Sequence, residues 1–134
     1  MVYVQTILKT LDNSGARYVQ CIKTLNKSLK KAIKAGQKIV ISVKKIIPRI
    51  VYNKKKHLRK KKTIQKGEVH LGIVVCCSKQ QIRNGWLLLK MEKNTVVIVN
   101  KQLVPYGSRV LGPVMEEVRY YGHVKIVSLS SFLI

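Results

Sequence analysis

The sequence predicts a mainly β fold: a small barrel of five or six short strands, followed by a short helical C-terminal part. Three observations support this prediction. Short runs rich in β-branched residues recur along the chain, turn residues separate them, and a well-supported helical pattern appears only after Asn100. No repeat and no linker divides the 134 residues, so we expect one domain over residues 1–134.

The first two strands are expected at Gln5–Leu11 and Tyr18–Leu25. The turn Asp12–Gly15 separates them, because Asp and Asn side chains bond nearby backbone groups and Gly tolerates positive φ. Alternation along the second strand places two sets of side chains on opposite faces. The sets are Val19, Cys21 and Leu25 on one face and Gln20, Ile22 and Thr24 on the other.

Residues Asn26–Gly36 are basic and rich in turn formers, and their one apolar pair at helical spacing, Leu29 and Ile33, does not suffice to predict a helix. Lys38–Ile47 is the clearest strand, and Pro48 ends it because proline cannot donate to a strand ladder. After it, Ile50–Tyr52 and Thr63–Gln65 flank a basic run and predict a projecting β-ribbon with a basic tip.

Val69–Cys77 is expected to be a core strand. Its residues alternate as Val69, Leu71, Ile73 and Val75 against His70, Gly72 and Val74. Asn84-Gly85 predicts a hairpin turn between Lys79–Arg83 and Trp86–Met91. Thr95–Val99 is a further short strand.

A helix is expected to begin at Pro113, with Glu116 and Glu117 in its first turn and Gly122 at its end. Its apolar face would carry Val114, Val118 and Tyr121. Lys125–Leu129 is short and β-like, and Ser130 or Ser131 could cap a final turn.

Charge indicates the partner. The chain has 27 Lys and Arg against 5 Asp and Glu, a formal charge of +22, which favours nucleic acid over an anionic membrane surface. No acidic residue lies between Asp12 and Glu68, so nothing nearby in the sequence neutralises the run Asn53–Lys62. Aromatic residues are only 6%, which favours recognition of folded RNA by its backbone and shape over reading of single strands.

The sequence offers little for catalysis, metal binding or membrane insertion. The five acids fall in four separate segments, and each histidine has a plain structural role: His57 in the basic run, His70 on a strand's outer face and His123 after a helix. No Cys and His pair has ligand spacing, so we expect no metal and no cofactor. Apolar runs fall short of the ~18–20 residues that span a bilayer, and no basic amphipathic helix suggests binding to a membrane surface.

Three cysteines without a CxxC motif favour a reducing compartment, and Cys76 and Cys77 are expected to point to opposite sides of their strand, one to the core and one to the surface. Met1–Thr6 resembles neither a secretory signal nor a transit peptide, so we expect the protein to act where it is made.

Motifs along the whole chain are similar to those of the universal large-subunit ribosomal protein L-fourteen family, of bacterial or organellar type. They are Gln5-Thr6, Leu11–Arg17, Cys21-Ile22-Lys23, Gly36, Ser42-Val43-Lys44, Ile47-Pro48-Arg49, Lys66–Val69, Asn94, Pro105–Val114 and Lys125–Leu129. The resemblance implies a five-stranded β-barrel with a projecting ribbon, direct binding to large-subunit rRNA, and a place at the subunit interface.

Several partners follow from the resemblance. They are small-subunit rRNA at an intersubunit bridge, neighbouring proteins of the L-nineteen and L-three families, and a ribosome-silencing factor. The family's docking surface for that factor contains a Thr-Arg pair and a lysine, which correspond here to Ser108, Arg109 and Lys125. The segment of about residues 105–134 is thus the expected protein interface.

Two sets of site residues are expected. The RNA-binding set comprises turn residues and cations: Asn13, Ser14, Arg17, Lys23, Lys44, Lys45, Arg49, Lys54, Lys55, Lys56, Arg59, Lys60, Lys61, Lys62, Lys66, Lys79 and Arg83. The protein-interface set comprises Ser108, Arg109, Leu111, Gly112, Pro113, Arg119 and Lys125.

The chain departs from the bacterial pattern in two places. About residues 53–63 are a basic insertion, and Cys76–Lys79 replaces a more basic Arg-Thr-Lys-Lys. We hypothesise that the insertion offsets the cations lost. The insertion and the heavy use of Lys and Ile favour the mitochondrial matrix, with a bacterial cytoplasm or a plastid also open. A non-ribosomal RNA-binding β-barrel is the alternative function.

Overall fold

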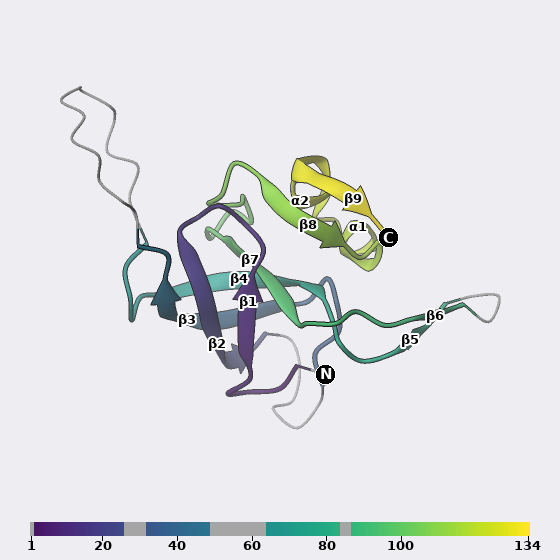
Figure 1. Ribbon diagram of the computed structural model, residues 1–134, viewed down its shortest axis with the longest axis horizontal. Coiled ribbons are helices and arrows are strands. Elements are labelled where there is room, and N and C mark those ends of the chain that lie inside the picture. Colours follow the sequence, from purple (N-terminus) through teal and green to yellow (C-terminus); the bar gives the residue numbers. More distant parts are fainter. Residues whose placement is uncertain (1, 26–31, 49–63, 84–86) are drawn as a thin grey trace.

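A closed five-stranded barrel forms the body of the protein. The computed structural model describes residues 2–25, 32–48, 64–83 and 87–134. The barrel strands follow the order β1-β2-β3-β4-β7, and β7 closes the barrel by pairing in parallel with β1 (Figure 1). Their bounds are β1 Ile7–Thr10, β2 Ala16–Thr24, β3 Lys38–Ile46, β4 Val69–Cys76 and β7 Thr95–Val99. The predicted barrel is confirmed. Most of the predicted ribbon, residues 50–63, lies outside the described residues, and residues 64 and 65 at its end belong to no strand.

The barrel interior is filled by side chains that alternate inward along each strand. The largest of them include Leu8, Val19, Ile39, Ile41, Val43, Val74 and Ile98, all at most 1% exposed. One predicted facing was wrong: Thr24 is buried in place of Leu25, because the β2–β3 register shifts between Cys21 and Lys23. The extra residue there, Ile22, turns outward and is 43% exposed.

Strands β4 and β7 are buried on both faces. Their inward residues belong to the barrel interior, whereas their outward residues Ile73, Val75, Val97 and Val99 form a second core. The residues that cover this second core come from the C-terminal end of the chain: Val110, Val114, Val118 and Ile126. We call residues 110–134 the C-terminal unit, and it lies against one side of the barrel in Figure 1.

The C-terminal unit holds two short helices between two strands. These elements are β8 Val110–Val114, α1 Glu117–Tyr120, α2 Val124–Leu129 and β9 Ser130–Leu133. Glu116 and Glu117 lie at the start of α1 as predicted, and Gly122, at φ +82°, follows the helix.

Three local predictions for the C-terminal unit were wrong. Pro113 lies in β8 and does not begin a helix; β8 pairs only with β9 in its sheet, so a residue without an N–H is tolerated there. Lys125–Leu129 is helical because burying Ile126 in the second core outweighs the weak strand preference of its neighbours. Ser130 and Ser131 begin β9 and no final turn follows them; instead Ser130 ends α2, where its hydroxyl donates to the Val127 carbonyl at 2.7 Å.

A hairpin projects from the barrel end where β4 finishes. Strands β5 Gln81–Ile82 and β6 Leu88–Leu89 pair in antiparallel fashion, and the Arg83 N–H donates to the Leu87 carbonyl at 3.0 Å. The predicted hairpin is confirmed, although its turn at Asn84-Gly85 lies outside the described residues. No helix in the described part of the chain is long and apolar enough to cross a membrane.

The vicinal cysteines do not divide between core and surface as predicted. Cys76 and Cys77 are both buried, at 2% and 1% exposure. The strand ends at Cys76 with a register shift against β7, so simple alternation does not extend to Cys77. Burial raises the pKa of all three thiols, that of Cys77 to about 11.

Candidate RNA-binding and protein-binding surfaces

Two bulge residues place cations at one end of the barrel. The β2–β3 pairing shifts register between Ala16 and Tyr18 and again between Tyr18 and Val19. The residues left without a direct partner are Arg17 on β2 and Lys44 on β3. A bulge turns its side chain away from the regular alternation, and both cations are exposed. Arg17 lies over the Tyr18 ring at 5.7 Å from its centroid.

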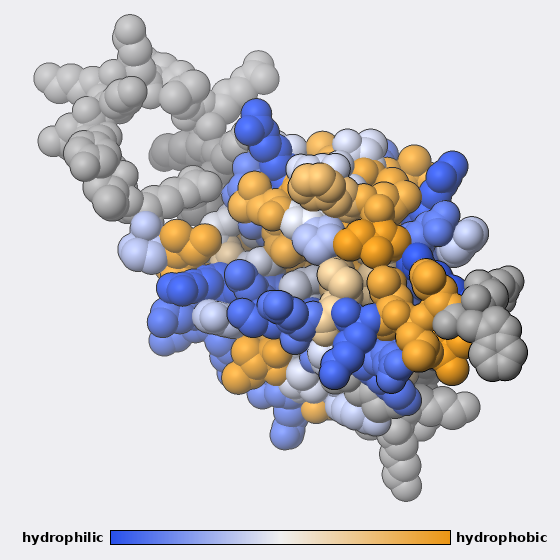
Figure 2. Space-filling view, turned by 45° about the vertical axis from the view of Figure 1, so that its right-hand side comes forward, coloured by the Kyte–Doolittle hydropathy of each residue, from blue (hydrophilic) through white to orange (hydrophobic). Residues whose placement is uncertain are grey.

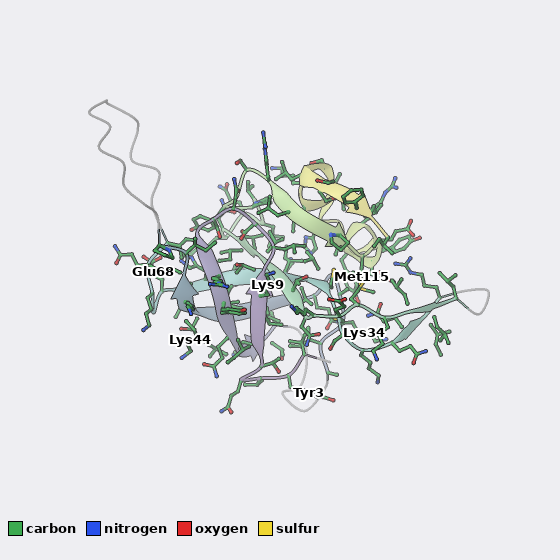
Figure 3. All side chains as sticks on the ribbon, in the orientation of Figure 1. Tyr3, Lys9, Lys34, Lys44, Glu68 and Met115 are labelled. Carbon is green, nitrogen blue, oxygen red and sulfur yellow. The ribbon has the colours of Figure 1, made fainter. Side chains whose placement is uncertain are left out.

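Lys45 and Lys66 join these two cations at the same end. Lys45 follows the bulge on β3 and faces solvent. Lys66 lies in the turn between residues 64 and 68, which is tied to β3 because the Gly67 N–H donates to the Val43 carbonyl at 2.8 Å. We use the name cationic end for Arg17, Lys44, Lys45 and Lys66. Figure 3 labels Lys44 and Glu68, the last residue of this turn, on the same side of the barrel.

The other predicted RNA-binding cations do not belong to this group. Lys23 is near the opposite end of β2, and Lys79 lies beside the β5–β6 hairpin. Apart from Arg83, which is described below, the remaining ones lie outside the described residues: Arg49, Lys54, Lys55, Lys56, Arg59, Lys60, Lys61 and Lys62.

The turn after β1 is held by a buried carboxylate. Asp12, only 3% exposed, accepts the Ile98 N–H at 3.2 Å on Oδ2 and the Ser14 hydroxyl at 2.8 Å on Oδ1. Burial raises the pKa of Asp12, and these hydrogen bonds oppose that rise. The carboxylate therefore fixes Asn13 and Ser14, both predicted to bind RNA, against β7.

Asn13 joins the two predicted surfaces. Its side-chain amide donates to the Ser108 hydroxyl at 2.9 Å, and its Oδ1 accepts the Arg109 N–H at 3.2 Å. The Asn13 N–H in turn donates to the Arg109 carbonyl at 3.3 Å. Gly107 permits this approach, because an added Cβ would lie 2.8 Å from Asn13 Oδ1. Sequence reasoning assigned Asn13 and Ser108 to different interfaces, and the structure brings their side chains into contact.

The C-terminal unit exposes apolar side chains beside the other predicted protein-interface residues. Leu111 is 69% exposed, Tyr120 78%, Val124 62% and Phe132 67%. Arg119 and Lys125 are exposed on α1 and α2, and Gly112 and Pro113 are half-buried in β8. In Figure 2 apolar side chains are frequent over the upper middle and the right of the view, with hydrophilic ones among them, and a group of hydrophilic side chains lies at the left. The C-terminal unit therefore exposes apolar side chains with cations beside them.

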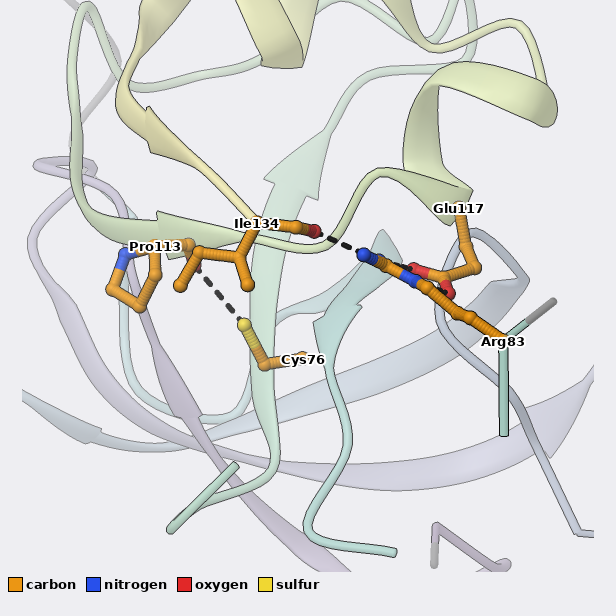
Figure 4. Close-up of polar contacts among 5 residues, drawn as sticks. All are labelled: Cys76, Arg83, Pro113, Glu117 and Ile134. Carbon is orange, nitrogen blue, oxygen red and sulfur yellow. Dashed lines mark hydrogen bonds and ion pairs between the residues drawn. The ribbon is translucent and has the colours of Figure 1, made fainter. Parts of the chain in front are cut away.

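Arg83, predicted to bind RNA, has partners within the chain. Its guanidinium donates to both carboxylate oxygens of Glu117, at 2.8 and 2.9 Å, and to the Ile134 carbonyl at 2.8 Å (Figure 4). The hydrogen bonds with Glu117 raise the pKa of Arg83. Burial raises the pKa of Glu117, but Arg83 outweighs it and holds that pKa below its usual range. The one adjacent pair of acids in the sequence, Glu116 and Glu117, was the available signal for this ion pair.

His123 and Cys76 also link the barrel to the C-terminal unit. The Nε2 of His123 lies 3.1 Å from the Gly36 carbonyl, and the Cys76 thiol donates to the Pro113 carbonyl at 3.0 Å (Figure 4). Burial lowers the pKa of His123. Sequence reasoning missed this role of His123, and no spacing signal could have revealed it. Among the described residues no three His, Cys, Asp or Glu side chains gather as a metal site would require.

The family comparison identifies the class of protein. The sequence profile of the family described as ribosomal protein L14p/L23e matches residues 1–134, the whole chain. The chain belongs to this family. As a member of L14p/L23e it is a structural protein of the large ribosomal subunit that takes part in translation, and membership implies binding of rRNA and of other ribosomal proteins there.

Proposed function

We propose that the cationic end of this L14p/L23e protein binds the phosphate backbone of large-subunit rRNA. The observation that carries this proposal is the clustering of Arg17, Lys44, Lys45 and Lys66, two of them placed by bulges. A rigid barrel holds these cations at fixed spacing, so they can match successive phosphates without being ordered on binding. Phosphate contacts position a protein on nucleic acid without reading its sequence.

A salt titration tests this proposal. Each phosphate contact contributes about 0.7–0.9 to the slope of log affinity against log salt. The variant Lys44→Gln/Lys45→Gln should therefore lower the slope for large-subunit rRNA by about 1.4–1.8. Lys90→Gln/Lys93→Gln removes the same charge from exposed residues near the opposite end of β7 and should leave the slope unchanged. Equal losses in the two variants would show that only net charge matters, against the proposal.

The C-terminal unit is the proposed protein-binding surface. Its exposed Leu111, Tyr120 and Phe132 offer apolar contact area of the kind that protein interfaces bury. We propose that it faces the neighbouring proteins of the L-nineteen and L-three families that the resemblance implies, and that the contact between Asn13 and Ser108 is part of the bridge to small-subunit rRNA. A silencing factor would bind at Ser108, Arg109 and Lys125.

The bridge is tested by substituting Arg109→Glu and measuring subunit joining by sedimentation. Unchanged joining contradicts the proposed bridge.

Two finer proposals concern the insertion and the compartment. Residues 53–63 add affinity for rRNA. Deletion of Asn53–Lys62 should therefore cause loss of the protein from large subunits during high-salt washing.

The ribosome is that of a mitochondrion, which the Lys and Ile bias supports. Fractionation of organelles followed by sedimentation tests this proposal. Absence from every large-subunit fraction would favour a non-ribosomal RNA-binding role.

A further inference from the structure

An open cavity of about 600 Å³ lies between three parts of the chain. One wall is the segment of residues 32–35, another is the start of the β5–β6 hairpin at residues 79–82, and the third is α1 with the residue that follows it. Its floor is apolar and closed, because Ile33, Ala35 and Cys77 are each at most 2% exposed. This volume is within the range of sites that hold small organic groups, about 300–1,000 Å³.

An aromatic ring forms one side of the cavity and is held in place. Tyr121 lies directly over Gly36, where an added Cβ would be 2.2 Å from the ring. Two residues later, His123 is bonded to the Gly36 carbonyl at 3.1 Å. Tyr121 as a whole residue is nevertheless 52% exposed, so its side chain is not sealed off from a ligand. Tyr121 is therefore a fixed, accessible aromatic surface.

The charges around the cavity favour an anion. Lys34 and Lys79 are exposed on two different walls. The one carboxylate among the lining residues, that of Glu117, is already occupied by the guanidinium of Arg83. Gln81 is half-buried on the hairpin wall and carries an amide that can donate and accept hydrogen bonds. The cavity thus combines an apolar floor, an aromatic side and two exposed lysines.

We propose that this cavity receives a single unstacked nucleotide of an RNA. The base lies in the cavity against the Tyr121 ring, and the flanking phosphates meet Lys34 and Lys79. Stacking of a base on an aromatic ring tolerates any base, so the site selects an extruded nucleotide and no particular sequence. This proposal rests on the proposed function, because it supposes that the protein binds RNA, but it concerns a surface remote from the cationic end.

Ultraviolet crosslinking of purified large subunits locates the contact. Irradiation joins bases to the tyrosine or cysteine side chains that they touch, and mass spectrometry of the digested protein identifies the peptide. The expected result is a nucleotide adduct on the peptide that contains Tyr121 or on the one that contains Cys77. Adducts elsewhere in the protein and none on these peptides overturn the cavity proposal and leave rRNA binding intact. Adducts on no peptide of the incorporated protein overturn both proposals.

Variants test the cavity in the isolated protein. The probes are an RNA hairpin with a one-nucleotide bulge and the same hairpin without it. Tyr121→Leu should weaken binding of the bulged hairpin about 5- to 100-fold, with little effect on the unbulged one, and Tyr121→Phe should bind both as the unchanged protein does. Equal weakening for both hairpins overturns the proposal. Chemical crosslinks that join Lys34 or Lys79 to another ribosomal protein would assign the cavity to a protein partner and also overturn it.

Discussion

Arg83 and Glu117, 34 residues apart in the sequence, form a two-pronged ion pair that ties the β5–β6 hairpin to the first turn of α1. The side chains are 22% and 23% exposed, so water screens the pair only in part. Guanidinium and carboxylate meet in parallel, the geometry that gives the strongest charge-assisted hydrogen bonds. The hairpin, α1 and the end of β9 are thereby fixed to one another.

A double-mutant cycle should detect this link. We expect Arg83→Gln and Glu117→Gln to show a coupling free energy of about 1–2 kcal/mol in urea unfolding, more than a fully exposed pair gives. Because the pKa of Glu117 is lowered, the contribution should be present at neutral pH and disappear as the pH falls through that lowered value. Lys90→Gln, on an exposed residue after β6, is the control and should change stability little. Additive effects of the two variants would contradict the coupling.

Gly36 should tolerate no side chain. It has φ +83°, and an added Cβ would lie 2.2 Å from the Tyr121 ring. Gly36→Ala should therefore cost about 1–2 kcal/mol for the backbone conformation and about 1–3 kcal/mol for overpacking. Gly67→Ala is the matched control, because Gly67 has φ +89° with open space around it, and should show the backbone cost alone. Equal losses of stability in the two variants would show that the Tyr121 contact imposes no constraint.

His123 should make stability depend on pH. Burial lowers its pKa in the folded protein, so the unfolded chain takes up a proton first as the pH falls below about 6.5. The unchanged protein should then lose up to about 1.4 kcal/mol per pH unit relative to His123→Gln, which keeps an N–H donor for the Gly36 carbonyl but does not titrate. Unfolding free energies at pH 7 and pH 5 check this. A constant difference between the two proteins would contradict it.

The second core should contribute to global stability. Ile126 is fully buried in it, whereas Val124 on the same helix is 62% exposed. Ile126→Ala should lower the unfolding free energy by about 2–5 kcal/mol, and Val124→Ala by less than about 0.5 kcal/mol. Urea unfolding followed by circular dichroism measures both. If Ile126→Ala instead produced a separate early transition, the C-terminal unit would unfold independently of the barrel.

Most barrel strands could be predicted from the sequence because their patterns are local. Thr95–Val99 was placed without error, and Lys38–Ile47 to within one residue, because β-branched runs bounded by turn formers usually form strands.

The register between paired strands was harder to predict from the sequence. Bulges at Arg17, Ile22 and Lys44 depend on how two strands match each other, and no single strand carries that information.

The C-terminal unit was the least predictable part of the fold. Lys125–Leu129 looks like a strand by composition, and only the buried position of Ile126 against β4 and β7 makes the helix favourable. The uninterrupted apolar run of Ile73–Cys76 was the signal that the outer face of β4 is covered. At the surface, the family motifs predicted Asn13 and Ser108 separately as site residues. The two residues are 95 positions apart in the sequence, so their contact could be found only from the folded structure.

The double burial of β4 and β7 also bears on the order in which the protein is made. A nascent chain that has reached Val99 contains all five barrel strands, yet it lacks every residue of the C-terminal unit that covers Ile73, Val75 and Val97. Until translation passes Ile126, the outer faces of β4 and β7 are exposed hydrophobic surface, and such surface promotes aggregation. A chain released before Ile126 would contain every strand of the barrel and still expose the outer faces of β4 and β7, so the cover over these strands is completed only after the barrel itself.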